Sequence, residues 1–300
     1  MNPKPTTIRR TKIRSLGYLG LAAPDLDEWR SFATDVFGLQ VAEGTTPEQL
    51  LLRCDERSWR IAITPGEGAL SYVGWEVSGE EDLEEAAEDL ATAGVKFAYD
   101  ADLAQERRVA GLVRTTDPAG NQVEIFYGPL VETERFVSPR GARFRTAEQG
   151  LGHIVIGVPD KEAELDFYQR TLGFRVSDSL GTGPNSLTFL HVNPRHHSLA
   201  VGRAPGEAGL HHFMLEVDDL DTVGMALDRV LANGIELRAT LGKHSNDHVV
   251  SFYVKSPSSC EVEYGWDGRP VDDTTWTTAH YARGDLWGHA RRREHTPGKH

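Results

Sequence analysis

Two histidines and one glutamate occupy matching positions in three predicted strands of the C-terminal half, namely His153, His212 and Glu263. Two imidazoles and one carboxylate are the donors of a facial triad, which binds one side of a divalent metal ion and leaves the opposite side open. A single histidine in an apolar strand is usually a core residue, but three such residues on equivalent strands are harder to explain by packing. The pattern therefore predicts a mononuclear metal site.

The stretch "GLHHFMLEV" (209–217) contains two adjacent histidines, and only one of them can enter such a site. Successive side chains of a strand point to opposite faces of the sheet. His211 shares its face with an apolar set that is typical of packing under helices, whereas His212 aligns with Tyr72 in the first half of the chain. We therefore predict that His212 is the ligand and that His211 lines the approach to the site.

The elements that must position these residues occur twice along the chain. "SLGYLGLAAPDLDEWRSFATDVFGLQV" (15–41) matches "GLGHIVIGVPDKEAELDFYQRTLGFRV" (150–176), and residues 72–95 match residues 212–235. Each matching segment predicts a strand followed by an amphipathic helix, and shorter strands follow each of them. The expected fold class is α+β, with four βαβββ modules in two tandem domains, each a curved sheet around a cavity.

Breaks in this pattern predict the domain limits. Residues 1–14 form a flexible N-terminal arm, and residues 15–137 form an N-terminal domain without a metal site. Residues 149–290 form the catalytic, metal-binding domain, and residues 291–300 form a basic tail. Proline, glycine and charged residues between the two domains mark the boundary.

The first copy of the repeat serves as a control for the second. Its residues at the three ligand positions are Tyr18, Tyr72 and Glu124. Glu261 lies two residues before Glu263 and shares its face, so strand parity alone does not separate them. The repeat favours Glu263, because Glu261 is matched by Gln122 in the first copy.

The composition excludes several classes of protein. A net charge of -13 argues against a nucleic-acid partner. No segment approaches the ~18 consecutive apolar residues of a membrane helix, and the first fifteen residues lack the apolar core of a secretory signal. The two cysteines, Cys54 and Cys260, suggest no disulfide framework, so we expect a cytoplasmic protein.

Several motifs in this order resemble one known family: "GLGH", "NPRHHSLA", "HHFMLEV", "LGKHSNDHVVSFY" and "EVEYGW". The chain is similar to the type I extradiol ring-cleaving dioxygenases of the vicinal oxygen chelate superfamily, closest to the 2,3-dihydroxybiphenyl 1,2-dioxygenases. The resemblance extends from "SLGYLG" to "LWGH" (286–289). It implies the glyoxalase/bleomycin-resistance/dihydroxybiphenyl dioxygenase fold, cleavage of a catechol by O2 beside its two hydroxyls, and a homo-oligomer.

The resemblance also assigns roles to single residues. It implies Fe(II) held by His153, His212 and Glu263, although Mn(II) accepts the same ligands. The catalytic residues that it implies are His197, His244 and Tyr253. The substrate-binding residues that it implies or suggests are Val155, Phe189, Ala200, His211, Asn246 and Asp247. Three further histidines, His191, His196 and His248, are interpreted as structural.

The substrate stays open at this stage. A dihydroxybiphenyl-like catechol, a simple alkylcatechol and a steroid-derived catechol all fit the motifs. The segment "LGTGPNSL" (180–187) is shorter than is usual in the biphenyl-type enzymes, which leaves the size of the pocket undecided. A metal-dependent glyoxalase or isomerase would use the same modules without oxygen chemistry. A metal-free drug-binding protein of this fold would not need the two histidines and the glutamate.

Overall fold

The computed structural model describes residues 12–183, 186–204 and 209–291. Most of the predicted N-terminal arm and all but the first residue of the predicted basic tail lie outside these ranges. The first strand begins at Ile13, so the last two residues of the predicted arm belong to the strand. No helix of the described ranges is long and apolar enough to cross a membrane.

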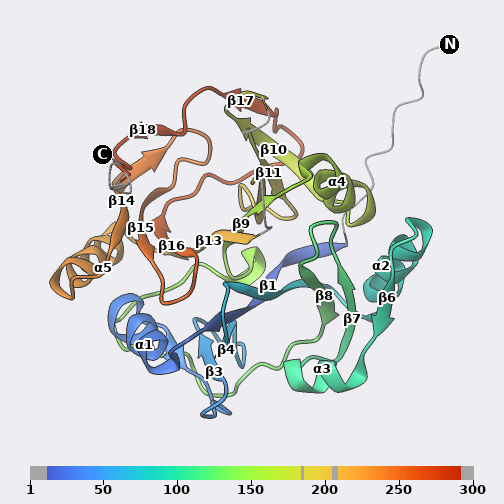
Figure 1. The fold of residues 1–300 in the computed structure, drawn as a ribbon, viewed down its shortest axis with the longest axis horizontal. Coiled ribbons are helices and arrows are strands. Elements are labelled where there is room, and N and C mark those ends of the chain that lie inside the picture. The colour runs from blue at the N-terminus through green and yellow to red at the C-terminus, as the bar shows by residue number, and fades with distance from the viewer. Residues whose placement is uncertain (1–11, 184–185, 205–208, 292–300) are drawn as a thin grey trace, which may run out of the picture.

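The N-terminal half contains two βαβββ modules that share one eight-stranded sheet (Figure 1). The sheet order is β2-β3-β4-β1-β5-β8-β7-β6. The elements of this half are β1 (Ile13–Ala23), α1 (Leu26–Ser31), the π-helix η1 (Phe32–Phe37), β2 (Gln40–Val41), β3 (Leu50–Arg53), β4 (Ile61–Pro65), β5 (Leu70–Val77), α2 (Glu80–Thr92), β6 (Phe97–Tyr99), α3 (Ala101–Arg107), β7 (Gly111–Thr116) and β8 (Gln122–Tyr127).

The C-terminal half repeats this arrangement in a ten-stranded sheet of order β17-β10-β11-β12-β9-β13-β16-β15-β14-β18. Its elements are the 3-10 turn η2 (Ala147–Gln149), β9 (His153–Val158), α4 (Lys161–Asp166), the π-helix η3 (Phe167–Thr171), β10 (Arg175–Leu180), β11 (Leu187–His191), β12 (Leu199–Arg203), β13 (Gly209–Val217), α5 (Leu220–Ala232), β14 (Leu237–His244), β15 (Val250–Lys255), β16 (Glu261–Trp266), β17 (Ala279–Tyr281) and β18 (Asp285–Trp287). The four predicted modules are therefore present.

Local sequence explains where the helices begin and end. The side chains of Asp25 and Asp160 accept hydrogen bonds from the first backbone N–H groups of α1 and α4, which satisfies donors that have no partner inside the helix. Gly38 follows η1 with a φ of 78°, a left-handed conformation that costs glycine little. The repeat thus carries its own start and stop signals.

The two halves share one hydrophobic core, and the helices of one half pack against those of the other. In Figure 1, α1 lies beside α5 and α2 lies beside α4. Hydrogen bonds cross the junction, from Trp29 Nε1 to Ser258 Oγ (2.9 Å) and from Arg229 Nε to the carbonyl of Val36 (2.8 Å). The apolar faces of the helices are buried by this pairing, so the inner faces of both sheets remain free to enclose side chains.

Three elements were not expected from the repeat. Helix α3 lies between β6 and β7, and β17 and β18 extend the second sheet at its two edges. Strand β17 pairs with β10, and β18 pairs with β14. The chain after β16 therefore returns to both edges of the second sheet, close to the site described next.

Candidate metal centre

Three adjacent strands of the second sheet bring the predicted ligands together. Strand β13 pairs with β9 on one side and with β16 on the other, and Met214 is in register with both His153 and Glu263. His212 lies two residues before Met214 and therefore points to the same face of the sheet. Residues more than fifty positions apart in sequence thus meet at one point.

The three donor atoms form a nearly equilateral triangle. His153 Nε2 lies 3.1 Å from Glu263 Oε2, His212 Nε2 lies 3.3 Å from the same oxygen, and the two Nε2 atoms are 3.3 Å apart. Metal–donor bonds of about 2.1 Å at right angles would separate adjacent donors by about 3.0 Å. The residues therefore fit one face of an octahedral ion and could hold a metal.

The protonation states of this group suit metal binding. Burial lowers the pKa of His212 to about 4, against the opposing effect of Glu263. Burial alone would raise the pKa of Glu263, but hydrogen bonds from His153, His212 and His244 hold it well below its usual value. A neutral imidazole and an ionised carboxylate are the forms that donate electron pairs to a metal.

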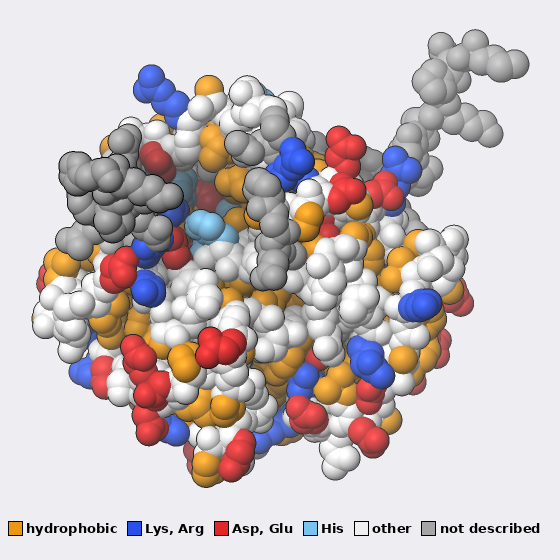
Figure 2. Space-filling view, in the orientation of Figure 1, with side chains coloured by type: hydrophobic (Ala, Val, Ile, Leu, Met, Phe, Trp, Pro, Cys, Tyr) orange, Lys and Arg blue, Asp and Glu red, His pale blue; other side chains and the backbone are white. Residues whose placement is uncertain are grey.

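The open side of the triangle faces a cavity of about 450 Å³. A histidine surface is visible within a hollow on the face shown in Figure 2. His197, His244 and Tyr253 line the cavity together with the triad. The His197 ring lies 3.9 Å from the ring of His153, centroid to centroid, and His244 Nε2 lies 2.7 Å from the hydroxyl of Tyr253.

Burial and neighbouring charges perturb all three of these polar residues. Burial lowers the pKa of His197 well below its usual value, and repulsion from His153 acts in the same direction. Burial opposes the charged form of His244, but hydrogen bonds to Asp285 and Glu263 raise its pKa well above the usual value. Burial and the Glu263 carboxylate raise the pKa of Tyr253 well above its usual value.

One wall of the cavity is apolar. Val155, Phe189 and Ala200 form a small buried cluster, with Leu180 and Leu187 packed against it. All five side chains except Ala200 line the cavity directly. The polar triad and this wall give the cavity one end for charged oxygens and another for hydrocarbon.

His211, which was expected at the approach to the site, lines the cavity and does not pack under a helix with the apolar residues of its strand face. A register shift between Leu210 and His212 displaces it, and the side chain is exposed at the cavity mouth. Its Nδ1 lies 2.8 Å from Nδ1 of His212. The regular alternation of the strand fails here because a bulge changes the direction of the side chain.

Asn246 and Asp247 are buried and line the cavity, but neither is hydrogen-bonded to His244. Asp247 Oδ2 instead lies 3.8 Å from Nδ1 of His197. The carboxylate that contacts His244 is Asp285, whose Oδ1 lies 3.0 Å from His244 Nδ1. Asp285 had not been predicted from the sequence.

Ser251 and His289 were also missed by sequence reasoning. The hydroxyl of Ser251 donates to Glu263 Oε1 at 2.6 Å, and His289 Nδ1 lies 2.6 Å from Asp285 Oδ1. The only signal for His289 was its place in the motif "LWGH" (286–289). Ser251 lies two residues before Tyr253, so strand parity could have placed it on the same face.

Glu261, the alternative to Glu263, forms ion pairs away from the triad. It contacts Arg238 at 3.1 Å and Arg291 at 3.1 Å. The side chain of Glu263 is 1% exposed and contacts both histidines of the triad. The choice of Glu263 from the repeat agrees with this geometry.

In the first half, an arginine occupies the place opposite the matching glutamate. Arg107 Nε and Nη2 both lie 3.0 Å from the carboxylate of Glu124, and the hydroxyl of Tyr18 donates to the same group at 2.6 Å. The guanidinium carbon lies 3.8 Å above the ring of Tyr72. A fixed cation therefore compensates the buried carboxylate, and within the described ranges the groups that could hold a metal all belong to the second half.

Comparison with known proteins gives the family. Residues 16–66 match the model for dihydroxybiphenyl dioxygenase BphC D1, and residues 150–264 match the glyoxalase/bleomycin resistance protein/dioxygenase superfamily. The chain is 46% identical to a biphenyl-2,3-diol 1,2-dioxygenase of Paraburkholderia xenovorans, over 92% of this chain and 95% of that protein. It is 42% identical to an iron-dependent extradiol dioxygenase of Rhodococcus jostii, over 92% and 97%.

A solved structure of a catechol 2,3-dioxygenase superimposes with a TM-score of 0.89 at 41% identity, covering 94% of this chain and 96% of the other. The same arrangement of modules is present in a manganese-bound glyoxalase of Novosphingobium aromaticivorans at 20% identity, a level that shows the fold alone. The coverage of the dioxygenases at more than 40% identity extends over both halves. The chain therefore belongs to the extradiol dioxygenase family, whose members are ring-cleaving oxidoreductases.

Proposed function

We propose that this protein cleaves a 3-substituted catechol beside its two hydroxyls, using O2 and an Fe(II) ion held by His153, His212 and Glu263. The observation that carries the proposal is the donor triangle, with edges of 3.1 to 3.3 Å, at the end of a half-apolar cavity. Iron is favoured over manganese because the relative from Rhodococcus jostii is named as iron-dependent. When bound, the iron supplies Lewis acidity toward the catechol oxygens and exchanges electrons with O2.

The cavity supports a catechol with a bulky apolar substituent. The hydroxyl end of the substrate would lie at the triad. Its substituent would pack on the wall of Val155, Phe189, Leu180 and Leu187, and Ala200 is buried in the same cluster. Burial of apolar surface stabilises such a complex by about 25 cal/mol for each Å² removed from water. Relatives that act on biphenyl-2,3-diol and on 3-methylcatechol, according to their names, support this class of substrate.

His197 is suited to move the proton of a substrate hydroxyl. Its ring lines the cavity beside His153, so one nitrogen can reach a catechol oxygen bound at the triad. General acid–base catalysis by a positioned histidine contributes typically about 10²- to 10⁴-fold to the rate. On the other side, His244 and Tyr253 form a hydrogen-bonded pair that can orient a second substrate oxygen.

Oxygen consumption tests this function. The iron-loaded protein is mixed separately with catechol, 3-methylcatechol and 2,3-dihydroxybiphenyl, while oxygen uptake and the yellow ring-opened product are recorded together. We expect uptake with a yellow product, and faster turnover of the two 3-substituted substrates. His197→Phe is the matched variant, which should retain iron and lose most of the turnover. Absence of uptake from protein with a full complement of iron would refute the proposal.

A further inference from the structure

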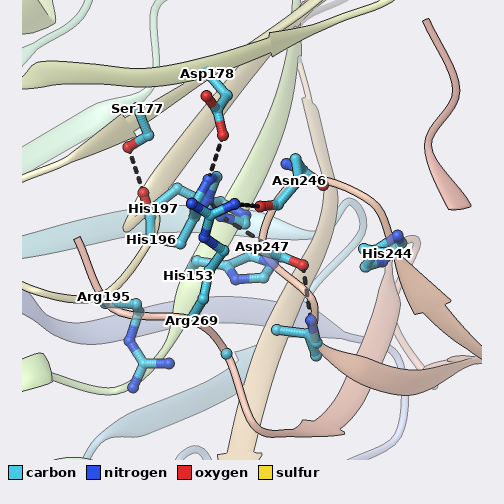
Figure 3. Close-up of polar contacts among 12 residues, drawn as sticks. His153, Ser177, Asp178, Arg195, His196, His197, His244, Asn246, Asp247 and Arg269 are labelled. Atoms are coloured by element: carbon cyan, nitrogen blue, oxygen red, sulfur yellow. Dashed lines mark hydrogen bonds and ion pairs between the residues drawn. The ribbon is translucent and has the colours of Figure 1, made fainter. Parts of the chain in front are cut away.

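A buried line of three residues leads away from the cavity behind His197 (Figure 3). His197 Nδ1 lies 3.1 Å from His196 Nδ1, and His196 Nε2 lies 2.7 Å from Asp178 Oδ2. The exposed fractions of Asp178, His196 and His197 are 0%, 3% and 3%. His196 had been interpreted as a structural residue, and Asp178 carried no signal in the sequence.

The partners of His196 determine its tautomer. A carboxylate only accepts hydrogen bonds, so Nε2 of His196 must carry a proton toward Asp178. In neutral His196 the other nitrogen, Nδ1, is then an acceptor. Nδ1 of His197 must supply the proton of the contact between the two rings, which leaves Nε2 of His197 with a free electron pair.

We propose that Asp178 and His196 are positioning residues that hold His197 as a base with Nε2 unprotonated, and that His196 receives the displaced proton. This inference rests on the proposed function, in which His197 accepts a proton from the substrate. The proton of the catechol hydroxyl moves to Nε2 of His197, and the Nδ1 proton of His197 moves to Nδ1 of His196. One proton enters the line and none leaves, so the positive charge rests on His196 beside Asp178.

The charges around the two rings favour transfer of the proton from His197 to His196. A positive charge on His197 would face the ring of His153, and the carboxylate beside its Nδ1, Asp247 Oδ2, lies at 3.8 Å, beyond hydrogen-bond distance. His196 lies farther from the triad than His197 and contacts the carboxylate of Asp178 at 2.7 Å. Among the hydrogen bonds and ion pairs of the described ranges, no arginine or lysine contacts this carboxylate. Displacement of the charge toward Asp178 therefore lowers the cost of the transfer.

The surrounding structure fixes this line in place. Asp178 Oδ1 accepts a hydrogen bond from the backbone N–H of Ala279 at 2.8 Å, so β17 holds the carboxylate in its orientation. The hydroxyl of Ser177 donates to the carbonyl of His196. The indole N–H of Trp276 donates to the carbonyl of Ser177 at 2.9 Å, and its ring lies 5.5 Å from that of His196.

Asp178→Asn tests the proposal, because it reverses the proton positions without a change of shape. The asparagine oxygen must face the N–H of Ala279, so its NH₂ group faces Nε2 of His196 and donates to it. His196 then carries its proton on Nδ1, and His197 is left with Nε2 protonated and unable to act as a base. A reversal of this kind lowers kcat by about 10²- to 10⁴-fold.

The measurements are iron content, melting temperature, catechol binding without oxygen, and kcat and KM with oxygen. We expect Asp178→Asn to lower kcat while iron content, anaerobic binding and KM stay as in the wild type. His196→Gln should do the same, because glutamine cannot relay a proton. Ser179→Ala is the control, since it removes an exposed hydrogen bond to His280 next to Asp178 in the same strand without contacting His196 or His197, and it should retain kcat.

An unchanged kcat in Asp178→Asn overturns the proposal. So does a fall of kcat in step with iron content and melting temperature in both Asp178→Asn and His196→Gln, which would indicate a purely structural role. The activity of the wild type distinguishes failure of the positioning role from failure of the proposed function. If the wild type itself consumes no oxygen, the proposed function fails before the variants are compared.

Discussion

Glu164 in α4 is predicted to make the protein less stable as pH rises through the neutral range. Its side chain is fully buried, and its Oε2 accepts a hydrogen bond from the backbone N–H of Ala119 at 3.1 Å, in the turn between β7 and β8. Burial raises the pKa of Glu164 to about 9, and hydrogen bonding to Asp117 and the charge of Asp117 act in the same direction. The protonated carboxyl therefore joins the two halves of the chain.

The direction of this pH dependence follows from the number of protons that Glu164 binds in the folded and in the unfolded chain. The unfolded chain releases this proton near pH 4.5, whereas the folded chain retains it until about pH 9. The stabilising contribution is complete below about pH 4.5 and is lost progressively up to about pH 9. Each pH unit between these limits lowers the free energy of unfolding by up to about 1.4 kcal/mol, so pH 8 should be less favourable than pH 6 by about 2 kcal/mol.

Glu164→Gln should remove this dependence. The glutamine is a neutral isostere that can accept the hydrogen bond from Ala119 and does not ionise. Urea unfolding of wild type and variant is compared at pH 6 and pH 8, with Glu162→Gln, an exposed position on the same helix, as the control. Between pH 6 and pH 8 we expect the free energy of unfolding of the wild type to fall by about 2 kcal/mol more than that of the variant. Equal pH dependence of the wild type and Glu164→Gln would refute the reasoning.

Three further predictions concern the cavity. His212→Ala should lose bound iron because one of three donors is removed, whereas His211→Ala should retain it at saturating iron; equal loss by metal analysis would contradict the geometry. Ser251→Ala leaves a buried oxygen of Glu263 without its 2.6 Å hydrogen bond, and a chelator titration should show about 10- to 100-fold weaker iron binding. Leu187→Trp should narrow the cavity at the apolar wall and lower kcat/KM for 2,3-dihydroxybiphenyl, but not for catechol; an equal fall for both would argue against this wall as the substituent site.

Much of the fold could be predicted from the sequence because the same pattern of strands and helices occurs twice in the chain. The repeated segment 72–95 predicts a strand followed by an amphipathic helix. The structure has β5 at Leu70–Val77 and α2 at Glu80–Thr92, and α2 buries Leu83, Ala86, Ala87 and Leu90. Helix α3 and strands β17 and β18 escaped notice, because they have no counterpart in the repeat. The short sequences of β17 and β18 do not specify a strand until the edge strand of a sheet is available for pairing. The predicted domain limits stay predictions.

The candidate ligands could also be predicted from local rules. Strand parity and the repeat together favour His212 over His211 and Glu263 over Glu261, and this choice of ligands stays a prediction. Parity failed only for the surroundings of His211, where a bulge between β13 and β9 redirects the side chain. A bulge depends on the pairing of two strands, and one sequence alone does not reveal it.

The sequence by itself determined the modules, the sheet face of each candidate ligand and the family resemblance, because all three depend on short-range periodicity and on a duplicated pattern. Only the tertiary structure decided which residues support that site. Asp285 reaches His244, and Asp178 meets both His196 and the backbone of β17, through contacts between residues far apart in the chain. Such contacts arise when a C-terminal segment without periodicity docks on the edges of a sheet. The burial of that edge, and not the local sequence, sets their geometry.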